Sequence, residues 1–161
     1  MPRADRLTER GVAMLQEKHV GILSTILPDG SPHATPVWVD VEPDGSHIII
    51  NTVEGHIKLR NINRDPRVAL TVVDSANHFR TVQVRGIVVE QLGHEQGARE
   101  HINVLSKKYT GRDPYVLGEG ERRVILKIKP THIFGTSGGG VGGNWRERQK
   151  DESADRPAIT G

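Results

Sequence analysis

The sequence predicts a mainly β fold of the α+β class, an antiparallel barrel of about six strands with flanking helices. Strand-like segments follow one another through tight turns rich in Pro, Asp and Gly. Strands and helices do not alternate regularly, which argues against a doubly wound parallel sheet. A glycine, Gly86, interrupts the longest strand-like segment, where a closing sheet would bend.

The first half of the chain predicts one helix and three strands. Thr8 can cap a helix that ends near Lys18, and Leu7 can pack on Val12 across its first turn. Three strand-like segments follow, joined by the turns PDG and EPDG: HVGILSTI, HATPVWVDV and HIIINT. Connections this short predict an antiparallel meander.

The second half predicts a helical turn over residues 57–63, three more strands and a second helix. The strands are RVALTVVD, RTVQVRGIVVEQL and RRVILKIKP, and Pro130 is expected to end the last one. The helix spans residues 95–109, where Ile102 and Leu105 fall on one apolar stripe. Residues 1–137 are therefore predicted to form one domain.

From residue 138 the composition becomes Gly-rich and then polar, which predicts a mobile tail over residues 138–161. The segment GGGVGG is typical of a linker, since no strand–turn–helix unit surrounds it. Trp145 is an isolated indole in this tail, and one hypothesis is that it closes over a site.

Composition excludes several classes of function. The absence of cysteine excludes disulfides and thiolate chemistry. A net charge of +2 argues against a nucleic-acid binder. No apolar run is long enough to span a membrane, and the charged N-terminus does not resemble a signal peptide, so a cytoplasmic location is expected. An apolar content of 35% suggests that a partner subunit covers part of the surface.

The segment GHIKLRNINRDPRVAL sets four cations, Lys58, Arg60, Arg64 and Arg67, just before a strand. Two interpretations are equally compatible with the spacing alone. The cations can form a solvated basic turn, or they can hold a phosphate together with free N–H groups of a helical turn. The spacing is not that of a Walker loop.

The sequence shows no HxH or HExxH pattern and no readable Ser–His–Asp arrangement. We therefore predict neither a metal site nor a catalytic side chain. Trp38 lies in a predicted strand, where an indole is typical of a core position.

The ordered motifs DGSPHATPVW, IIINT, GHIKLRNINRDPRVAL and VQVRG resemble the pyridoxamine 5'-phosphate oxidase-like split β-barrel superfamily. Within it the chain is most similar to the branch of oxidoreductases that use the deazaflavin F420. The resemblance implies a six-stranded FMN-binding-type split barrel and a homodimer with two sites at the subunit interface. It also implies an F420H2-dependent oxidoreductase that transfers a hydride to a small organic acceptor. The alternatives are an FMN-dependent oxidase or reductase, or a protein that only binds such a cofactor.

The resemblance also implies a set of cofactor-binding residues: His33, Thr35, Val37, Asn51, Thr52, His56, Lys58, Arg60, Asn61 and Phe79. Lys58 would be the main phosphate cation, and Asn61 and Arg60 would brace its loop. Many relatives carry arginine where this chain has His56, which weakens the phosphate clamp. Phe79 would come from the partner subunit.

The strand that carries His33, Thr35 and Val37 would lie beside the ring system, with Asn51 and Thr52 below it. Two further arginines, Arg64 and Arg67, are either structural or meet an acidic cofactor tail.

Overall fold

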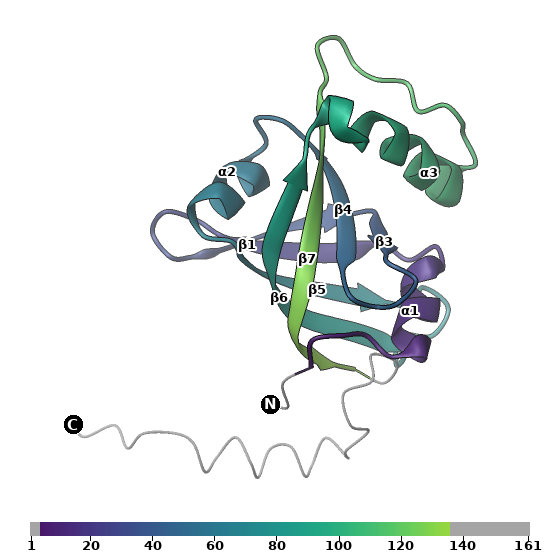
Figure 1. The fold of residues 1–161 in the computed structure, drawn as a ribbon. Helices are drawn as coiled ribbons and strands as arrows, with labels where there is room; N and C mark the ends of the chain where they lie inside the picture. The colour runs from purple at the N-terminus through teal and green to yellow at the C-terminus, as the bar shows by residue number, and fades with distance from the viewer. Residues whose placement is uncertain (1–3, 136–161) are drawn as a thin grey trace, which may run out of the picture.

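The computed structural model describes residues 4–135, which form a single curled sheet of seven strands with three α-helices around it (Figure 1). A short 3-10 helix, His94–Gln96, precedes the last α-helix. The elements follow one another as α1 (Glu9–Gln16), β1 (Gly21–Ile26), β2 (Pro32–Val37), β3 (Val39–Val41), β4 (Ile48–Val53), α2 (Ile57–Arg64), β5 (Arg67–Val73), β6 (Thr81–Leu92), α3 (Ala98–Thr110) and β7 (Arg123–Phe134).

The strand order β2-β1-β5-β6-β7-β4-β3 explains the curl of the sheet, in which all neighbours are antiparallel. The two edge strands, β2 and β3, are consecutive in the chain, and only Trp38 separates them. The two edges of the sheet must therefore meet at this residue. The predicted mainly β, antiparallel split barrel is confirmed.

The predicted count of six strands is wrong by one, and the extra strand arises at Trp38. We predicted HATPVWVDV as a single strand, but its first half pairs with β1 and its second half with β4. Alternating burial continues through the break, since Val37, Val39 and Val41 are all buried. The periodicity of a strand was thus read correctly, but periodicity does not reveal a change of partner.

Most of the local predictions are confirmed. The backbone N–H of Gly11 donates to Thr8 Oγ1 at 3.3 Å, which makes Thr8 the N-cap of α1. The register between β6 and β7 shifts at Gly86, as expected of a bulge. A Cβ at this position would lie 2.7 Å from the backbone oxygen of Lys129, so the close approach of β7 requires glycine.

The expectation that Pro130 ends the last strand is wrong, because β7 continues to Phe134. Pro130 pairs with Gly86 at the register shift of β6. On its other side β4 pairs with β7 only as far as Ile128. Proline is tolerated at such a bulge and strand edge, where its missing N–H is not needed by a neighbour.

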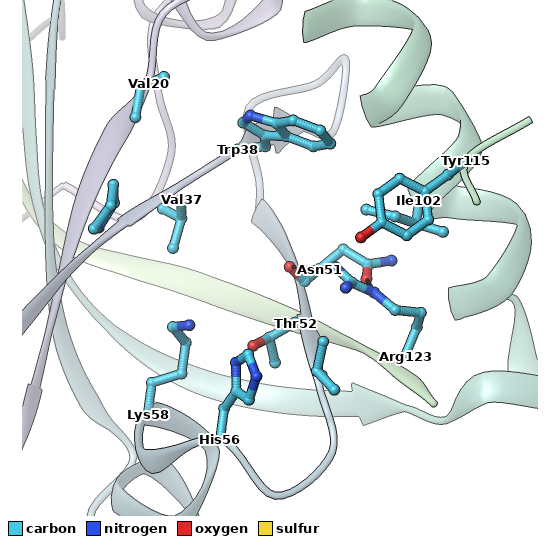
Figure 2. A pocket seen from close by; sticks show the side chains of 12 residues that line it. Val20, Val37, Trp38, Asn51, Thr52, His56, Lys58, Ile102, Tyr115 and Arg123 are labelled. Atoms are coloured by element: carbon cyan, nitrogen blue, oxygen red, sulfur yellow. Dashed lines mark hydrogen bonds between the residues drawn. The ribbon is translucent and has the colours of Figure 1, made fainter. Parts of the chain in front are cut away.

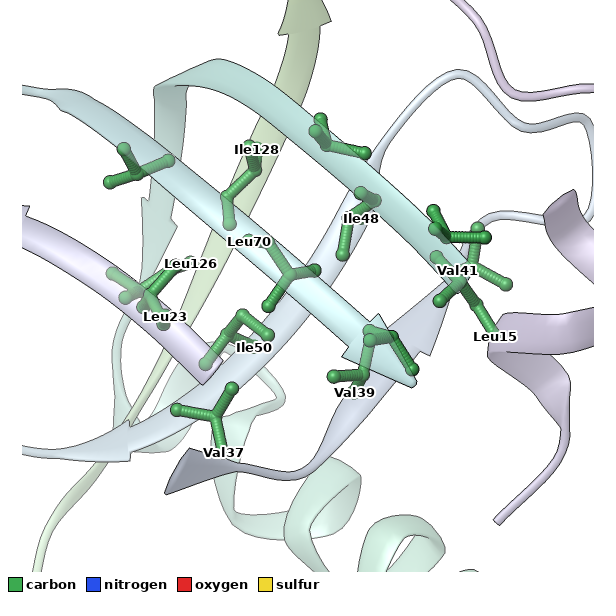
Figure 3. Close-up of a cluster of buried hydrophobic side chains, with 14 of the residues drawn as sticks. Leu15, Leu23, Val37, Val39, Val41, Ile48, Ile50, Leu70, Leu126 and Ile128 are labelled. Atoms are coloured by element: carbon green, nitrogen blue, oxygen red, sulfur yellow. The ribbon is translucent and has the colours of Figure 1, made fainter. Parts of the chain in front are cut away.

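The main core fills the inside of the curled sheet. Alternate residues of the strands point inward, and α1 adds Met14 and Leu15 to the same cluster (Figure 3). A smaller cluster of Ile102, Leu105 and Tyr109 lies under α3, against Trp38. The positions predicted for the apolar stripe of the second helix are confirmed as buried.

The predictions for the tail and for Trp145 concern residues outside those that the structure describes. Within residues 4–135, none of the helices has both the length and the hydropathy needed to cross a bilayer.

Candidate functional site

A cavity of about 370 Å³ lies where the two sheet edges meet α2, α3 and the connection between α3 and β7. Figure 2 shows Lys58 and His56 on one side of this cavity and Trp38 on another. Tyr115 lines it from the connection before β7, and Arg123 from the beginning of β7. Five predicted site residues line the cavity: Val37, Asn51, Thr52, His56 and Lys58.

Lys58 is a half-buried cation in the first turn of α2. Burial lowers its pKa below the ordinary value, and the positive charge of Arg123 lowers the pKa further. Within residues 4–135, no carboxylate forms an ion pair with it. The ammonium group is therefore held close to a second cation without a counter-ion, an arrangement that an anionic ligand would relieve.

His56 is the N-cap residue of α2, but its side chain forms no capping hydrogen bond. Burial, then Lys58 and Arg123, lower the pKa of the imidazole below its usual 6.5. The ring is therefore mostly neutral at pH 7. It leaves the start of α2, where the helix dipole favours negative charge, open to a ligand.

Arg123 was missed by the sequence analysis, although it lines the same cavity. Its side chain is buried, with Nε donating to Asn51 Oδ1 at 2.7 Å and Nη1 donating to Glu121 Oε1 at 2.7 Å. The guanidinium also lies over the ring of Tyr115, 5.5 Å from its centroid. Nothing in RRVILKIKP distinguishes it from any other arginine at the beginning of a strand.

Asn51 lines the cavity, but its side-chain amide is engaged by the protein. Its Nδ2 donates to the backbone oxygen of Ala98 at 2.8 Å and lies 3.2 Å from His101 Nδ1, while its Oδ1 accepts from Arg123. The amide thus connects β4 to α3 and β7. Its neighbour Thr52 differs, because the buried Thr52 Oγ1 has no hydrogen-bond partner.

Three buried side-chain polar atoms within the described residues lack a hydrogen-bond partner: His33 Nδ1, Thr35 Oγ1 and Thr52 Oγ1. All three belong to residues that the resemblance implied as cofactor-binding. His33 and Thr35 lie on β2, on the same side of the strand as Val37, although they do not line the 370 Å³ cavity. Buried polar atoms without partners are rare in folded proteins, so these positions are suited to a polar ligand.

Three other predicted residues lie away from the cavity lining. Asn61 is buried; its Nδ2 donates to Thr25 Oγ1 at 3.0 Å, and its Oδ1 accepts from Arg64. These contacts fix α2 to β1. Arg60 is exposed on α2, and Phe79 is 74% exposed in the connection between β5 and β6.

The other arginines of the basic segment have protein partners. Arg67 forms a bidentate pair with Asp65, with its Nη2 donating to Oδ2 at 2.6 Å. This hydrogen bonding holds the pKa of Asp65 down to about 2. Arg64 donates to the backbone oxygen of Ile26 as well as to Asn61.

Trp38 packs on the small core, as expected, but it is also a wall of the cavity. Its ring stacks on Tyr109 with the centroids 5.3 Å apart and the planes 3° from parallel. The Tyr109 hydroxyl donates to the backbone oxygen of His19 at 2.8 Å, which anchors the stack to the chain before β1.

A second cluster of charges lies apart from this cavity and consists of Glu17, His19, Asp74 and Arg80. Its three possible metal ligands lie within 4.8 Å of one another, a convergence that the sequence did not reveal. Arg80 Nη1 donates to Glu17 at 2.7 Å and to Asp74 at 2.9 Å. The guanidinium thus already supplies the positive charge that these carboxylates need.

Comparison with known proteins decides the family. The sequence signature described as pyridoxamine 5'-phosphate oxidase matches residues 7–137. This chain belongs to that family. The predicted resemblance is confirmed, and it covers nearly all of the residues that the structure describes.

Two relatives of this family member carry names that mention F420. An F420H(2)-dependent biliverdin reductase from Mycobacterium tuberculosis (strain CDC 1551 / Oshkosh) is 24% identical over 132 residues, which is 82% of this chain and 90% of the relative. A solved structure named F420 reductase is 29% identical with a TM-score of 0.66, over 76% of this chain and 94% of the other.

The fold also matches a pyridoxamine 5'-phosphate oxidase-like structure from Lactobacillus delbrueckii. The identity is 23% and the TM-score 0.58, over 83% of this chain and 99% of that one. This comparison supports the fold alone.

Proposed function

We propose that this chain binds F420 and acts as an F420H2-dependent oxidoreductase that transfers a hydride to a small organic acceptor. The observation that carries the proposal is Lys58, a half-buried cation at the start of α2 with no carboxylate paired to it among the described residues. It lies in a cavity whose volume falls within the usual range for small-molecule sites. The F420-named relatives support the choice of cofactor.

The residues present fit such a cofactor. Lys58 and the N–H groups at the start of α2 would hold its phosphate, and Thr52 Oγ1 would gain the hydrogen bond it lacks. On β2, His33 and Thr35 offer further unpartnered polar atoms, and Val37 offers an apolar surface for a flat ring.

The reduced deazaflavin supplies the hydride when it is bound, so the chain itself need not provide a redox group. The protein binds the cofactor, orients it and excludes water around it. Reduction of an acceptor also consumes a proton, which solvent or a side chain such as His33 would deliver.

We also propose that the chain works as a cytoplasmic homodimer in which the partner completes each site. Two observations favour a covered surface: Phe79 is 74% exposed, and Val20 and Ile22 are half exposed around β1. Val20 itself lines the cavity. Sedimentation or light scattering would measure the stoichiometry, and a monomer at micromolar concentration would contradict this part.

The test of the proposed function is a fluorescence titration of the purified protein with F420 and, separately, with FMN at the same salt concentration. We expect micromolar or tighter binding of F420 and weaker binding of FMN. Tight binding of FMN alone would assign the chain to the FMN-dependent branch, which its family membership keeps as the second candidate. If neither binds, the assignment of the cavity is wrong.

A protein that only carries the cofactor would bind F420H2 but would not oxidise it with any acceptor. Mixing the loaded protein with enones, quinones, tetrapyrroles and nitro compounds, and following cofactor absorbance, separates this alternative from the enzyme. We expect oxidation with at least one of these classes.

A further inference from the structure

The polar side chains behind the cavity form one continuous hydrogen-bonded series, here called the relay: Asp40, His101, Asn51 and Arg123. His101 Nε2 lies 3.0 Å from Asp40 Oδ2, and His101 Nδ1 lies 3.2 Å from Asn51 Nδ2. Asn51 Oδ1 then accepts from Arg123 Nε at 2.7 Å. We propose that Asp40, His101 and Asn51 are positioning residues that help to orient the Arg123 guanidinium at the cavity while His101 is neutral with its proton on Nε2.

The orientation of the Asn51 amide determines the state of His101. The backbone oxygen of Ala98 can only accept, so the Asn51 atom that faces it must be the donor Nδ2. Arg123 Nε can only donate, so the atom that faces it must be Oδ1. The orientation of the amide is thus fixed, because Ala98 O can only accept and Arg123 Nε can only donate. Nδ2 therefore faces His101 and must donate to its Nδ1. The imidazole proton is then on Nε2 and is donated to Asp40.

A second proton on His101 is incompatible with this arrangement. It would sit on Nδ1, and two donors would then face each other over 3.2 Å. Asn51 cannot turn its amide to accept this proton, because it would lose the bond to Ala98 and present an N–H to Arg123 Nε. Protonation of His101 must therefore break the relay between His101 and Asn51, and the amide is then held by Ala98 and Arg123 alone.

The charged groups around the relay are Asp40 on β3, which pairs with His101, Lys108 on α3, and Arg123 on β7, which pairs with Glu121. Burial raises the pKa of Asp40, but its hydrogen bonds to His101 and to the backbone lower it more, so the net shift is downward. Asp40 is therefore ionised at neutral pH.

The consequence for the cavity rests on the proposed function. Arg123 is the second cation of the cavity, and in its relay-fixed position it would contribute to holding an anionic group of the ligand. When His101 gains its second proton, this contribution should be weakened, because Asn51 then holds Arg123 without the support of His101. The affinity for the ligand would then decrease as the pH is lowered, although His101 itself does not contact the ligand.

The first test uses the unliganded full-length protein and does not depend on any cofactor. Imidazole ¹⁵N shifts report the tautomer of His101, and the Nε–Hε signal of Arg123, assigned with an Arg123→Lys variant, reports the end of the relay. We expect the Nε2–H form wherever the ring is neutral, and a change in the Arg123 signal with the same midpoint as the measured protonation of His101. A proton on Nδ1, or an Arg123 signal without a step at that midpoint, would overturn the proposal.

Two matched variants separate positioning from folding. In His101→Gln the amide can accept from Asn51 and donate to Asp40, but it does not titrate. In His101→Leu both hydrogen bonds are lost at similar volume. We expect the Arg123 signal to keep its high-pH position at all pH values in the first and to be shifted from that position in the second. A pH step that remains in His101→Gln would overturn the relay; this variant and the wild type decide the matter even if His101→Leu does not fold.

The affinity measurement extends the test to function. F420 titrations above and below the His101 midpoint should show a loss of about tenfold in the wild type, the scale of one charge-assisted hydrogen bond. The loss should be much smaller in His101→Gln. Equal losses in the two proteins would show that His101 is not the group through which pH changes the affinity, and would overturn the functional part of the proposal. Absence of F420 binding at every pH would sink the proposed function, while the unliganded signals would still decide the relay.

Discussion

The two clusters of charge in this chain differ in whether their charges are matched. In the cluster of Glu17, His19, Asp74 and Arg80, the guanidinium donates to both carboxylates at hydrogen-bond distance. At the cavity, Lys58 stands beside the cation Arg123 with no carboxylate partner of its own within the described residues.

The pKa shifts show what this difference means for the fold. The pKa of Glu17 is lowered to about 2, chiefly by the hydrogen bond from Arg80, so its charged form is favoured. The pKa of Lys58 is also lowered, but for a lysine this disfavours the charged form. The first cluster stabilises the folded state, whereas the second retains an unfavourable charge, as functional sites often do.

Removing the unmatched charge should have the largest effect on binding. Lys58→Ala should weaken F420 binding by about 1.5–3 kcal/mol, or roughly 10- to 150-fold, because it removes a charge-assisted hydrogen bond to the phosphate. Arg67→Ala is the matched control: Arg67 belongs to the same basic segment, is exposed and is already paired with Asp65. Fluorescence titration compares the two, and similar losses would show that general charge rather than position matters.

Breaking the matched cluster should affect stability instead of binding. Arg80→Leu should lower the free energy of unfolding at pH 7, since it leaves Glu17 and Asp74 without their main partner. The folded-state pKa of Glu17 lies below its ordinary 4.5, so the stabilisation is present above pH 4.5 and is lost as the pH falls toward about 2. Urea unfolding of wild type and variant should therefore converge over this range.

The exposed arginine Arg122 provides the control for that measurement. It pairs with Glu95 and Glu54 on the surface, and exposed pairs contribute little. Arg122→Leu should leave the unfolding midpoint nearly unchanged. A loss as large as that of Arg80→Leu would mean that matching within the cluster is not what stabilises it.

The charge of Lys58 should have a smaller effect on the free energy of unfolding than the loss of Arg80. Lys58 has a lower pKa in the folded chain than its ordinary 10.5, so between these two pKa values the unfolded chain binds more protons and stability should rise with pH. Lys58→Met removes both the charge and this rise, and should unfold at the same or a higher urea concentration at pH 7. A clear destabilisation would contradict the idea that the charge is unfavourable without a ligand.

The smallest effect should come from His56. Its pKa is lowered, so it carries little charge at pH 7. His56→Arg adds a permanent cation at the start of α2 and should tighten F420 binding by a few fold at neutral pH. At more acidic pH, below the lowered pKa of the histidine, titrations should show a smaller difference. Weaker binding in the variant would place the phosphate elsewhere.

The fold was largely predictable from local signals. Each of these signals depends on a few neighbouring residues: the periodicity of the strands, the turn at Gly45, the cap at Thr8 and the bulge at Gly86. The two errors, at Trp38 and Pro130, depend on which strands are neighbours in the sheet. A single sequence does not contain that information, since strand pairing is a property of the whole fold.

The candidate site was predictable where one segment supplies it and not where distant segments meet. Lys58 and His56 follow one another in the basic segment, and the motif resemblance identified them. Arg123 lines the cavity from β7, whereas His101 on α3 is connected to it only through Asn51. Asn51 was predicted as a ligand contact, but its amide hydrogen bonds show that it organises the protein side of the cavity.

The junction at Trp38 has a consequence for folding and for engineering. The contacts that place the two sheet edges side by side, β1 with β5 and β4 with β7, join distant parts of the chain, so they form slowly. A single residue, Trp38, links the two edge strands, so the connection has no spare length. Inserting a single residue there would reverse the inward and outward faces of either β2 or β3, and Val37 or Val39 would leave the core. The junction at Trp38 should therefore tolerate a substitution far better than an insertion or a deletion.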